Sequence, residues 1–270
     1  MTSKQRLALA TLFSAAVISS LPACGGGGSA TPAASPPAPG QVFGETARAC
    51  YETPPPVVGD RASTVLEYLG PINGSQKYDG QLVDKDATFE GATGLLQFDG
   101  INSGSTNLDF LADGTNKTYS KIISPGVRAQ YGGVIKFNDR TPSLGPTRID
   151  TVKTFLNPPA IDEQANLVVG SSLTLIRNSV ITSTLIDGTV LPPIPFTQTT
   201  TVKFIGRENV TVPAGTFFAC KFESTEAGSS DTGTSWIFRA AFIKSSGQSS
   251  TGTQVIQLKS ATVNGLPFLN

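Results

Sequence analysis

Short segments rich in β-branched and aromatic residues recur from about Gln41 to the end of the chain, and clusters of Gly, Pro, Asn, Asp or Ser separate them. This pattern is typical of β-strands joined by turns, and no long stretch shows the apolar spacing of a helix. We therefore expect an all-β fold, a single antiparallel domain. The pattern predicts strands at 64–69, 88–98, 107–111, 118–123, 129–137, 173–185, 199–205, 216–223, 235–243 and 253–263.

One hairpin can be predicted in detail from the segment VTVPAGTFFACKF. Pro213 and Gly215 occupy the second and fourth positions of a tight turn, and an alternating strand follows. Successive side chains of a strand point to opposite faces, so Phe218, Cys220 and Phe222 share one face. This pattern predicts that Cys220 points into the core.

The predicted strand 235–243 is apolar on both faces. One face carries Trp236, Phe238, Ala240 and Phe242, and the other is also largely apolar. Such a strand is either covered on both sides or has one side lining a hydrophobic cavity.

The first residues of the chain form a secretory signal. Lys4 and Arg6 precede an apolar run at 7–18, which is too short to span a bilayer of about 30 Å, and small residues follow. The tetrapeptide Leu-Pro-Ala-Cys ends at Cys24 and resembles the lipobox of bacterial lipoproteins. The resemblance implies cleavage of a signal peptide at 1–23 and lipidation of Cys24 with acyl chains such as palmitate, which anchor the protein to a membrane. The alternative is an ordinary signal peptide with a chance cysteine.

A linker separates the anchor from the domain. Residues 24–40 comprise Cys24 and a Gly/Pro-rich stretch without charge or large apolar side chains, so we expect a flexible tether. The β domain then occupies 41–270. By resemblance to lipoproteins of bacteria with two membranes, Gly25 in place of Asp favours the outer membrane, so the expected location is the cell envelope.

Composition removes several classes of function. Twenty basic and twenty acidic residues give zero net charge, which argues against nucleic acid as a partner. The chain has no histidine, and this excludes Ser-His-Asp and Cys-His nucleophiles and His-ligated metals. An acidic cluster at Asp84, Asp86 and Glu90 lacks the spacing of a calcium loop. We therefore predict no catalytic residue, no metal and no cofactor.

The segment 208–217, followed by Cys220 and the Trp236 strand, is similar to a group of secreted or lipidated bacterial proteins of uncharacterised function with a VTVPAGTF-type hairpin. That group resembles in expected architecture the periplasmic lipoprotein-carrier superfamily, an open β half-barrel with a concave apolar cavity. The resemblance covers about a quarter of the chain. It departs at 239–242, where this chain lacks a glycine-rich turn.

This resemblance implies a curved sheet or open half-barrel, with a β-sandwich as the alternative. If a ligand cavity exists, the residues predicted to line it are Phe218, Phe222, Trp236, Phe238 and Phe242. Each of them is alternatively a plain core residue.

Two cysteines remain after lipidation, Cys50 and Cys220. An exported protein with one remaining pair favours a disulfide between them. The alternative is that Cys220 is a buried free thiol and Cys50 lies elsewhere.

The sequence favours a non-enzymatic bacterial envelope lipoprotein that binds a hydrophobic ligand or an envelope protein. Two alternatives stay open: a structural or adhesive surface lipoprotein, and a hydrolase that uses a pair of carboxylates.

Overall fold

The computed structural model describes residues 45–106, 113–137, 149–229, 232–249 and 252–268. Within them, thirteen antiparallel strands follow one another in sequence order in a single sheet. No helix of these residues has the length and apolar character needed to cross a bilayer. The elements are η2 (Ala47–Cys50), β1 (Arg61–Leu69), β2 (Gly74–Phe89), β3 (Ala92–Thr106), β4 (Gly114–Ser124), β5 (Val127–Phe137), β6 (Ile149–Asp162), η5 (Gln164–Asn166), β7 (Ser172–Leu185), β8 (Ile194–Val212), β9 (Gly215–Glu226), β10 (Thr232–Phe238), β11 (Ala241–Ser249), β12 (Gly252–Val263) and β13 (Leu266–Pro267).

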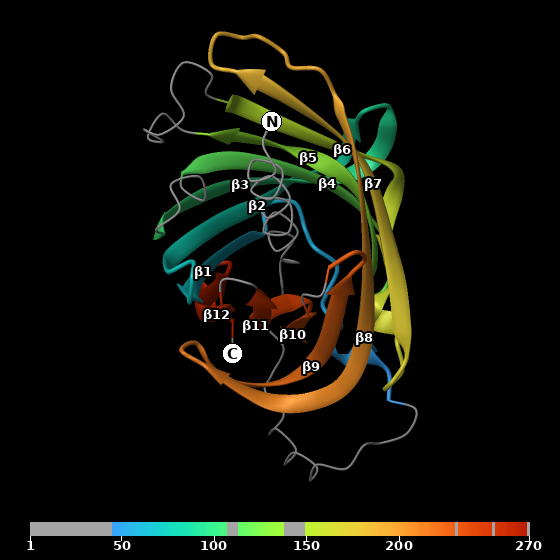
Figure 1. Ribbon diagram of the computed structural model, residues 1–270, viewed down its shortest axis with the longest axis vertical. Helices are drawn as coiled ribbons and strands as arrows, with labels where there is room; N and C mark the ends of the chain where they lie inside the picture. The colour runs from blue at the N-terminus through green and yellow to red at the C-terminus, as the bar shows by residue number, and fades with distance from the viewer. Residues whose placement is uncertain (1–44, 107–112, 138–148, 230–231, 250–251, 269–270) are drawn as a thin grey trace.

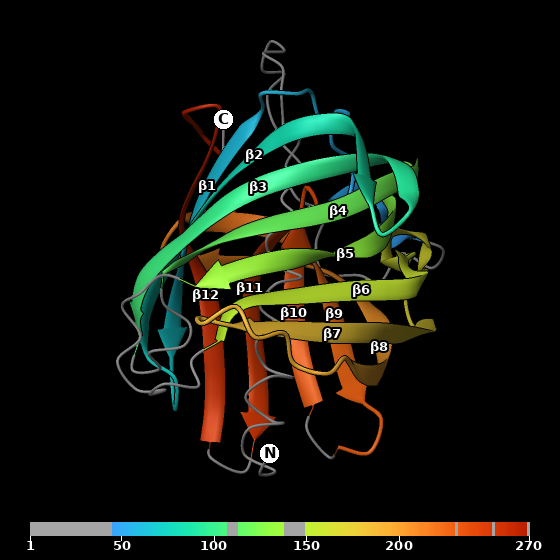
Figure 2. The ribbon, with the colours of Figure 1, turned by 90° about the horizontal axis from the view of Figure 1, so that it is seen from above.

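The sheet closes into a barrel of twelve strands, because β1 pairs with β12 from Ala62↔Val263 to Leu69↔Val255. The predicted open half-barrel is therefore wrong, whereas the single antiparallel all-β domain is confirmed. Closure gives the backbone N–H and C=O groups of β1 and β12 partners that an open edge would leave exposed. In Figure 1 these two strands lie side by side next to β11, and Figure 2 shows β2–β7 running across the upright strands β9–β12.

The face of β1–β7 that points into the barrel is the more buried one. In β7, Leu175, Ser179, Ile181 and Ser183 are buried, whereas Ile176 and Val180 between them are exposed. At Gly132 of β5 the neighbouring strand β6 comes very close to the backbone. Gly132 has a φ of +132°, and a Cβ on it would clash with the backbone oxygen of Thr154 in β6.

Most of the predicted strands lie within observed ones, and the tight hairpin is confirmed. β8 ends at Val212, β9 begins at Gly215, and these two residues are paired. The sequence pattern missed β6 and the short β13 entirely, and it missed all of β2 except the last two residues. β2 is largely polar, and in β6 polar residues and the prolines at 158 and 159 interrupt the apolar ones, so neither has the continuous apolar or aromatic character used as the signal. The predicted strand 107–111 lies outside the described residues.

Two predicted strands contain a turn and are corrected. Segment 88–98 reverses at Glu90–Gly91, and segment 235–243 reverses at Arg239–Ala240. In both turns the two central residues have positive φ, 48° and 84° in the first and 48° and 56° in the second. Such turns usually carry Asn-Gly or a similar pair, and the second has no glycine, so its sequence does not reveal it.

The turn at Arg239–Ala240 changes the predicted faces of this region. Ile237 is paired with Phe242, so these two side chains share a face, and Trp236 lies on the opposite one. The two-sided apolar strand was one reason to expect a hydrophobic cavity here, and that reason no longer holds.

Candidate functional site

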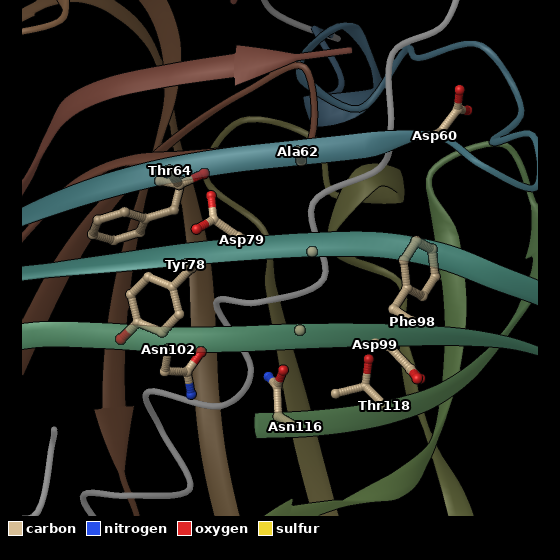
Figure 3. A pocket seen from close by; sticks show the side chains of 13 residues that line it. Asp60, Ala62, Thr64, Tyr78, Asp79, Phe98, Asp99, Asn102, Asn116 and Thr118 are labelled. Carbon is tan, nitrogen blue, oxygen red and sulfur yellow. The ribbon is translucent and has the colours of Figure 1, made fainter. Parts of the chain in front are cut away.

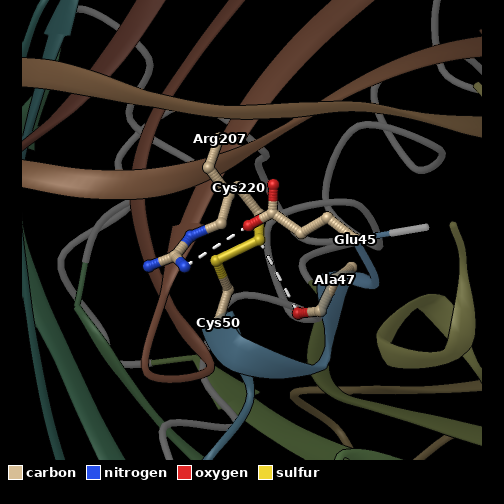
Figure 4. The surroundings of a disulfide bond; sticks show 5 residues. All are labelled: Glu45, Ala47, Cys50, Arg207 and Cys220. Carbon is tan, nitrogen blue, oxygen red and sulfur yellow. Dashed lines mark hydrogen bonds and ion pairs between the residues drawn. A yellow bond between two sulfur atoms is a disulfide. The ribbon is translucent and has the colours of Figure 1, made fainter. Parts of the chain in front are cut away.

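A disulfide joins Cys50 of η2 to Cys220 of β9, with the two Cα atoms 6.0 Å apart (Figure 4). The predicted pairing is thus confirmed. Both cysteines have no exposed surface, as expected for Cys220. The bond closes a sequence separation of 170 residues and fixes the start of the domain against the long β8–β9 hairpin.

The segment around η2 packs on the inward-pointing side chains of β7, β8 and β9. Ala47 and Cys50 form a buried cluster with Leu175, Phe204 and Phe222, among others. Backbone hydrogen bonds hold the same segment to the chain after η5: Ala47 N–H donates to Leu167 O, and Val169 N–H donates to Glu45 O. At its edge the Arg207 guanidinium lies 3.4 Å from the Glu45 carboxylate (Figure 4).

A small cavity of about 30 Å³ lies against β1–β4 (Figure 3). Its lining combines polar residues such as Thr64, Tyr78 and Asn102 with the aromatic side chains of Phe98 and Phe242. A Cβ on Gly100 would clash with the Asn116 side chain, so the glycine gives that amide its space. A cavity of this size holds water molecules and no larger ligand.

Polar side chains joined by hydrogen bonds occupy the interior of the barrel next to this cavity. The Tyr78 hydroxyl donates to Gln76 Oε1 at 2.6 Å, and the Tyr68 hydroxyl lies 3.3 Å from the same oxygen. Burial raises the pKa of both tyrosines, so they stay protonated as donors. This part of the interior is therefore occupied by the protein itself.

A hollow of about 1060 Å³ lies over β1–β4 and the end of β12. Charged residues that line it already have partners within the strands: Asp79 pairs with Lys77 at 2.7 Å, and Asp99 with Lys117 at 3.7 Å. We regard it as a poor site for an apolar ligand, because such a ligand would have to desolvate these charges.

A third hollow combines an apolar wall with a charged floor, and we call it the proline cleft. Its volume is about 710 Å³, within the range of ligand pockets, which is about 300–1,000 Å³. It lies between the segment that follows η2, the β4–β5 turn and Ala240 of the β10–β11 turn. The apolar wall is formed by Pro54, Pro55, Pro56, Ile122, Pro125 and Val127, and the polar lining by Tyr51, Glu52, Thr53, Ser124, Arg128, Gln130 and Asp162.

Strand register brings the charged groups of the proline cleft together. Arg128 is the second residue of β5, and its partner across to β6 is Asp162, so both side chains lie on the same face. Arg177 of β7 is close enough to Asp162 to interact with it electrostatically. Among the described residues no ion pair joins either arginine to Asp162, whose carboxylate accepts the Gln164 backbone N–H at 3.1 Å and side-chain Nε2–H at 3.4 Å.

The side chains of Asp162, Arg128 and Arg177 are largely buried from solvent. Burial raises the pKa of Asp162, against the hydrogen bond from Gln164 and the nearby guanidinium groups. Burial lowers the pKa of Arg128 and Arg177, against the attraction of Asp162. Burial, with a smaller contribution from Asp162, raises the pKa of Tyr51. The Nη1 of Arg128 and the Nε of Arg177 are buried without a hydrogen-bond partner.

The structure places the five aromatic residues predicted to line a cavity in several different surroundings. Phe242 lines the small cavity of Figure 3. Phe222 is fully buried beside Phe204, and Phe218 stacks under the Arg207 guanidinium at 4.3 Å. The other two lie elsewhere: Phe238 packs against Phe217, and the Trp236 indole N–H donates to Glu208 at 2.8 Å.

Sequence reasoning missed Arg128, Asp162 and Arg177. They lie on three different strands, and β6 was not predicted. The signal that existed was weak: Arg177 stands in line with the buried Leu175 and Ile181, where an apolar residue would be expected, whereas Arg128 alternates with the buried Val127 and Ala129 and gives no such signal. Cys24, the signal peptide and the linker lie outside the described residues.

A scan of known family models and a search of the curated proteins found no match. Two solved structures are similar. A candidate lipoprotein of Parabacteroides distasonis has a TM-score of 0.31 and 10% identity, covering 76% of this chain and 96% of the other. A candidate exported protein of Bacteroides fragilis, described as having a YmcC-like fold, has a TM-score of 0.32 and 8% identity, with the same coverage.

Proposed function

We propose that the protein is a non-enzymatic, lipid-anchored protein of the bacterial envelope whose barrel binds a hydrophobic ligand. The observation that carries the binding function is the proline cleft, an opening of about 710 Å³ with an apolar wall. The other two hollows are less suitable, because one is too small and the other is lined by paired charges. The lipobox at Cys24 supports the anchor.

Native mass spectrometry tests ligand binding on the full chain purified from bacterial envelopes. We expect a co-purifying small apolar molecule that leaves on organic extraction. Ser124→Trp places a large side chain in the proline cleft and should abolish this adduct, whereas Thr174→Trp on the exposed face of β7 should retain it. A clean apo mass for the unmodified chain, or an equal adduct in Ser124→Trp, would contradict the proposal.

The anchor has an independent test. Cells that produce the protein are grown with an alkyne analogue of palmitate, and the protein is then examined for the label. We expect labelling and envelope association of the unmodified chain, and loss of both in Cys24→Ser. A Cys24→Ser protein that stays in the envelope fraction like its parent would show that lipidation does not hold the protein there.

A further inference from the structure

We infer that the side of the barrel that holds the proline cleft lies against a lipid bilayer, with exposed aliphatic side chains in contact with the membrane surface. The inference rests on the anchor proposed at Cys24, and it adds the orientation in which that anchor holds the domain. In this orientation the proline cleft lies beside the lipid, so an apolar ligand can enter it without crossing water.

The first observation is a group of exposed aliphatic side chains along the border of the cleft. Single aliphatic residues are common on protein surfaces, but a group of them beside one hollow is typical of a binding surface. We call this group the aliphatic rim. It comprises six residues that are between 41% and 55% exposed: Val57, Val58, Ile122, Ile123, Ile161 and Val168.

The lining of the cleft brings the rim together from separate segments of the chain. Val57 and Val58 directly follow the three prolines of the cleft wall, and Ile122 of β4 belongs to the same wall. Ile123 and Ile161 each stand next to a residue that lines the cleft. In Figure 2 the ends of β4 and β6, which carry the three isoleucines, lie on the same side of the barrel.

Val168 joins the rim through η5. A Cβ placed on Gly126 of the β4–β5 turn would touch both Tyr51 and Ala165, so η5 packs directly against the lining of the cleft. Val168 follows η5 by two residues and pairs with Thr46 in an isolated β-bridge. The rim therefore extends from the proline wall to the place where the chain enters the domain.

The second observation is the place of the tether. Val169 N–H donates to Glu45 O, so the chain that leads back to Cys24 leaves the domain at the aliphatic rim. Twenty residues separate Cys24 from Glu45, and a flexible chain of that length has a root-mean-square reach of about 25 Å. β7 begins beside the rim and is 14 residues long, about 45 Å of strand, so its far end lies beyond that reach. An anchored Cys24 thus keeps the rim, and not the far end of β7, near the bilayer.

The third observation is the balance of charge. Along the described segments that carry the rim, the exposed charged residues are two of each sign: Arg48, Lys121, Glu52 and Glu163. Such a surface gains little from anionic head groups, so burial of the aliphatic side chains provides the contact. The matching probe is therefore a bilayer of phosphatidylcholine, which has no net charge.

The connection after β7 offers a matched control. Ile186 and Val190 are 52% and 63% exposed, at least as much as most of the rim, but they lie at the end of β7 away from the tether. Comparing Ile123 with Ile186, and Val168 with Val190, changes the place on the barrel and keeps the residue type.

Quenching of tryptophan fluorescence by brominated phosphatidylcholine tests the inference. The chain from residue 24 on, with Cys24→Ser and a hexahistidine tag in front, is exported through a cleavable signal peptide and held by its tag on vesicles that contain a nickel-chelating lipid. The tether is thus kept whether or not Cys24 is lipidated. The parent gives the background from Trp236. We expect the brominated lipid to lower the emission added by Ile123→Trp about twofold or more, and to leave that added by Ile186→Trp unchanged.

A second substitution shows whether the aliphatic contacts hold the domain in place. In the Ile123→Trp chain, Val168→Asp should reduce the quenching at position 123 about twofold or more, since a charged side chain opposes burial in the membrane surface. Val190→Asp in the same chain should leave the quenching unchanged.

Three results would overturn the inference: no quenching at position 123, quenching at position 186 as strong as at 123, or equal effects of Val168→Asp and Val190→Asp. The last would show that nearness to the tag, and not docking, brings position 123 to the lipid. Labelling of Cys24 and the native mass spectrum test the anchor and the ligand separately, so a failure of either is distinguishable from a failure of the docking surface.

Discussion

Removal of the disulfide should lower the stability of the domain strongly. The perturbation is the double variant Cys50→Ala/Cys220→Ala, compared with the oxidised parent and with the parent after reduction. The bond closes a sequence separation of 170 residues. For a loop of this length the chain-entropy relation gives a stabilisation of about 5 kcal/mol, and measured losses are about 2–5 kcal/mol. This is a large part of the total, because domains are stable by only about 5–15 kcal/mol.

Urea unfolding followed by tryptophan fluorescence measures this loss. Trp236 is the single tryptophan, and its indole N–H donates to Glu208 across the sheet, so unfolding changes its surroundings. We expect the midpoint to fall in both the double variant and the reduced parent, and the dependence on urea to steepen, since the unbridged chain exposes more surface. The reduced parent keeps both sulfur atoms and so separates the cross-link from the loss of buried volume.

The reasoning would be refuted if both forms unfolded within about 1 kcal/mol of the oxidised parent, well below the range for a bond of this span. A loss in the double variant alone would assign the effect to packing of the fully buried side chains at positions 50 and 220.

Four further predictions concern single positions. Ala240→Gly should raise the free energy of unfolding by about 0.5–1 kcal/mol, because Ala240 has a φ of 56°; a lower melting temperature would contradict this. Gly132→Ala should lower it by about 3 kcal/mol or more, since its Cβ would meet the Thr154 carbonyl, and a folded variant of parental stability in urea unfolding would disprove the clash. Phe222→Ala should cost about 3–5 kcal/mol in the same assay because its side chain is fully buried, and a cost below about 1 kcal/mol would mean that the site is not packed. The raised pKa of Asp162 means that the folded state keeps a proton that the unfolded chain releases near about pH 4, so this group's stabilising contribution is lost as pH rises through the raised pKa; the parent should lose stability over that interval relative to Asp162→Asn, and parallel pH profiles would refute it.

The amino-acid sequence alone determined the features that depend on neighbours along the chain. Segments rich in β-branched and aromatic residues were enough for most of the antiparallel strands, and Pro213 with Gly215 was enough for the β8–β9 turn. The pairing of Cys50 with Cys220 followed from their number and the secretory signal, without any geometry. These features depend on residues close together in the chain or on a simple count of residues, so a single sequence is enough to predict them.

Tertiary structure decided what depends on which strands meet. The pairing of β1 with β12 closes the barrel, and the sequence of neither strand indicates which strand it pairs with. The reversal at Arg239–Ala240 occurs without a glycine and places Phe242 on the face opposite Trp236. Arg128, Asp162 and Arg177 converge only because β5, β6 and β7 are neighbours in the sheet, in a register that no residue pattern reveals. A charged side chain on a strand looks the same in the sequence whether it faces water or a buried cleft, so the chemistry of this site is a property of the closed barrel.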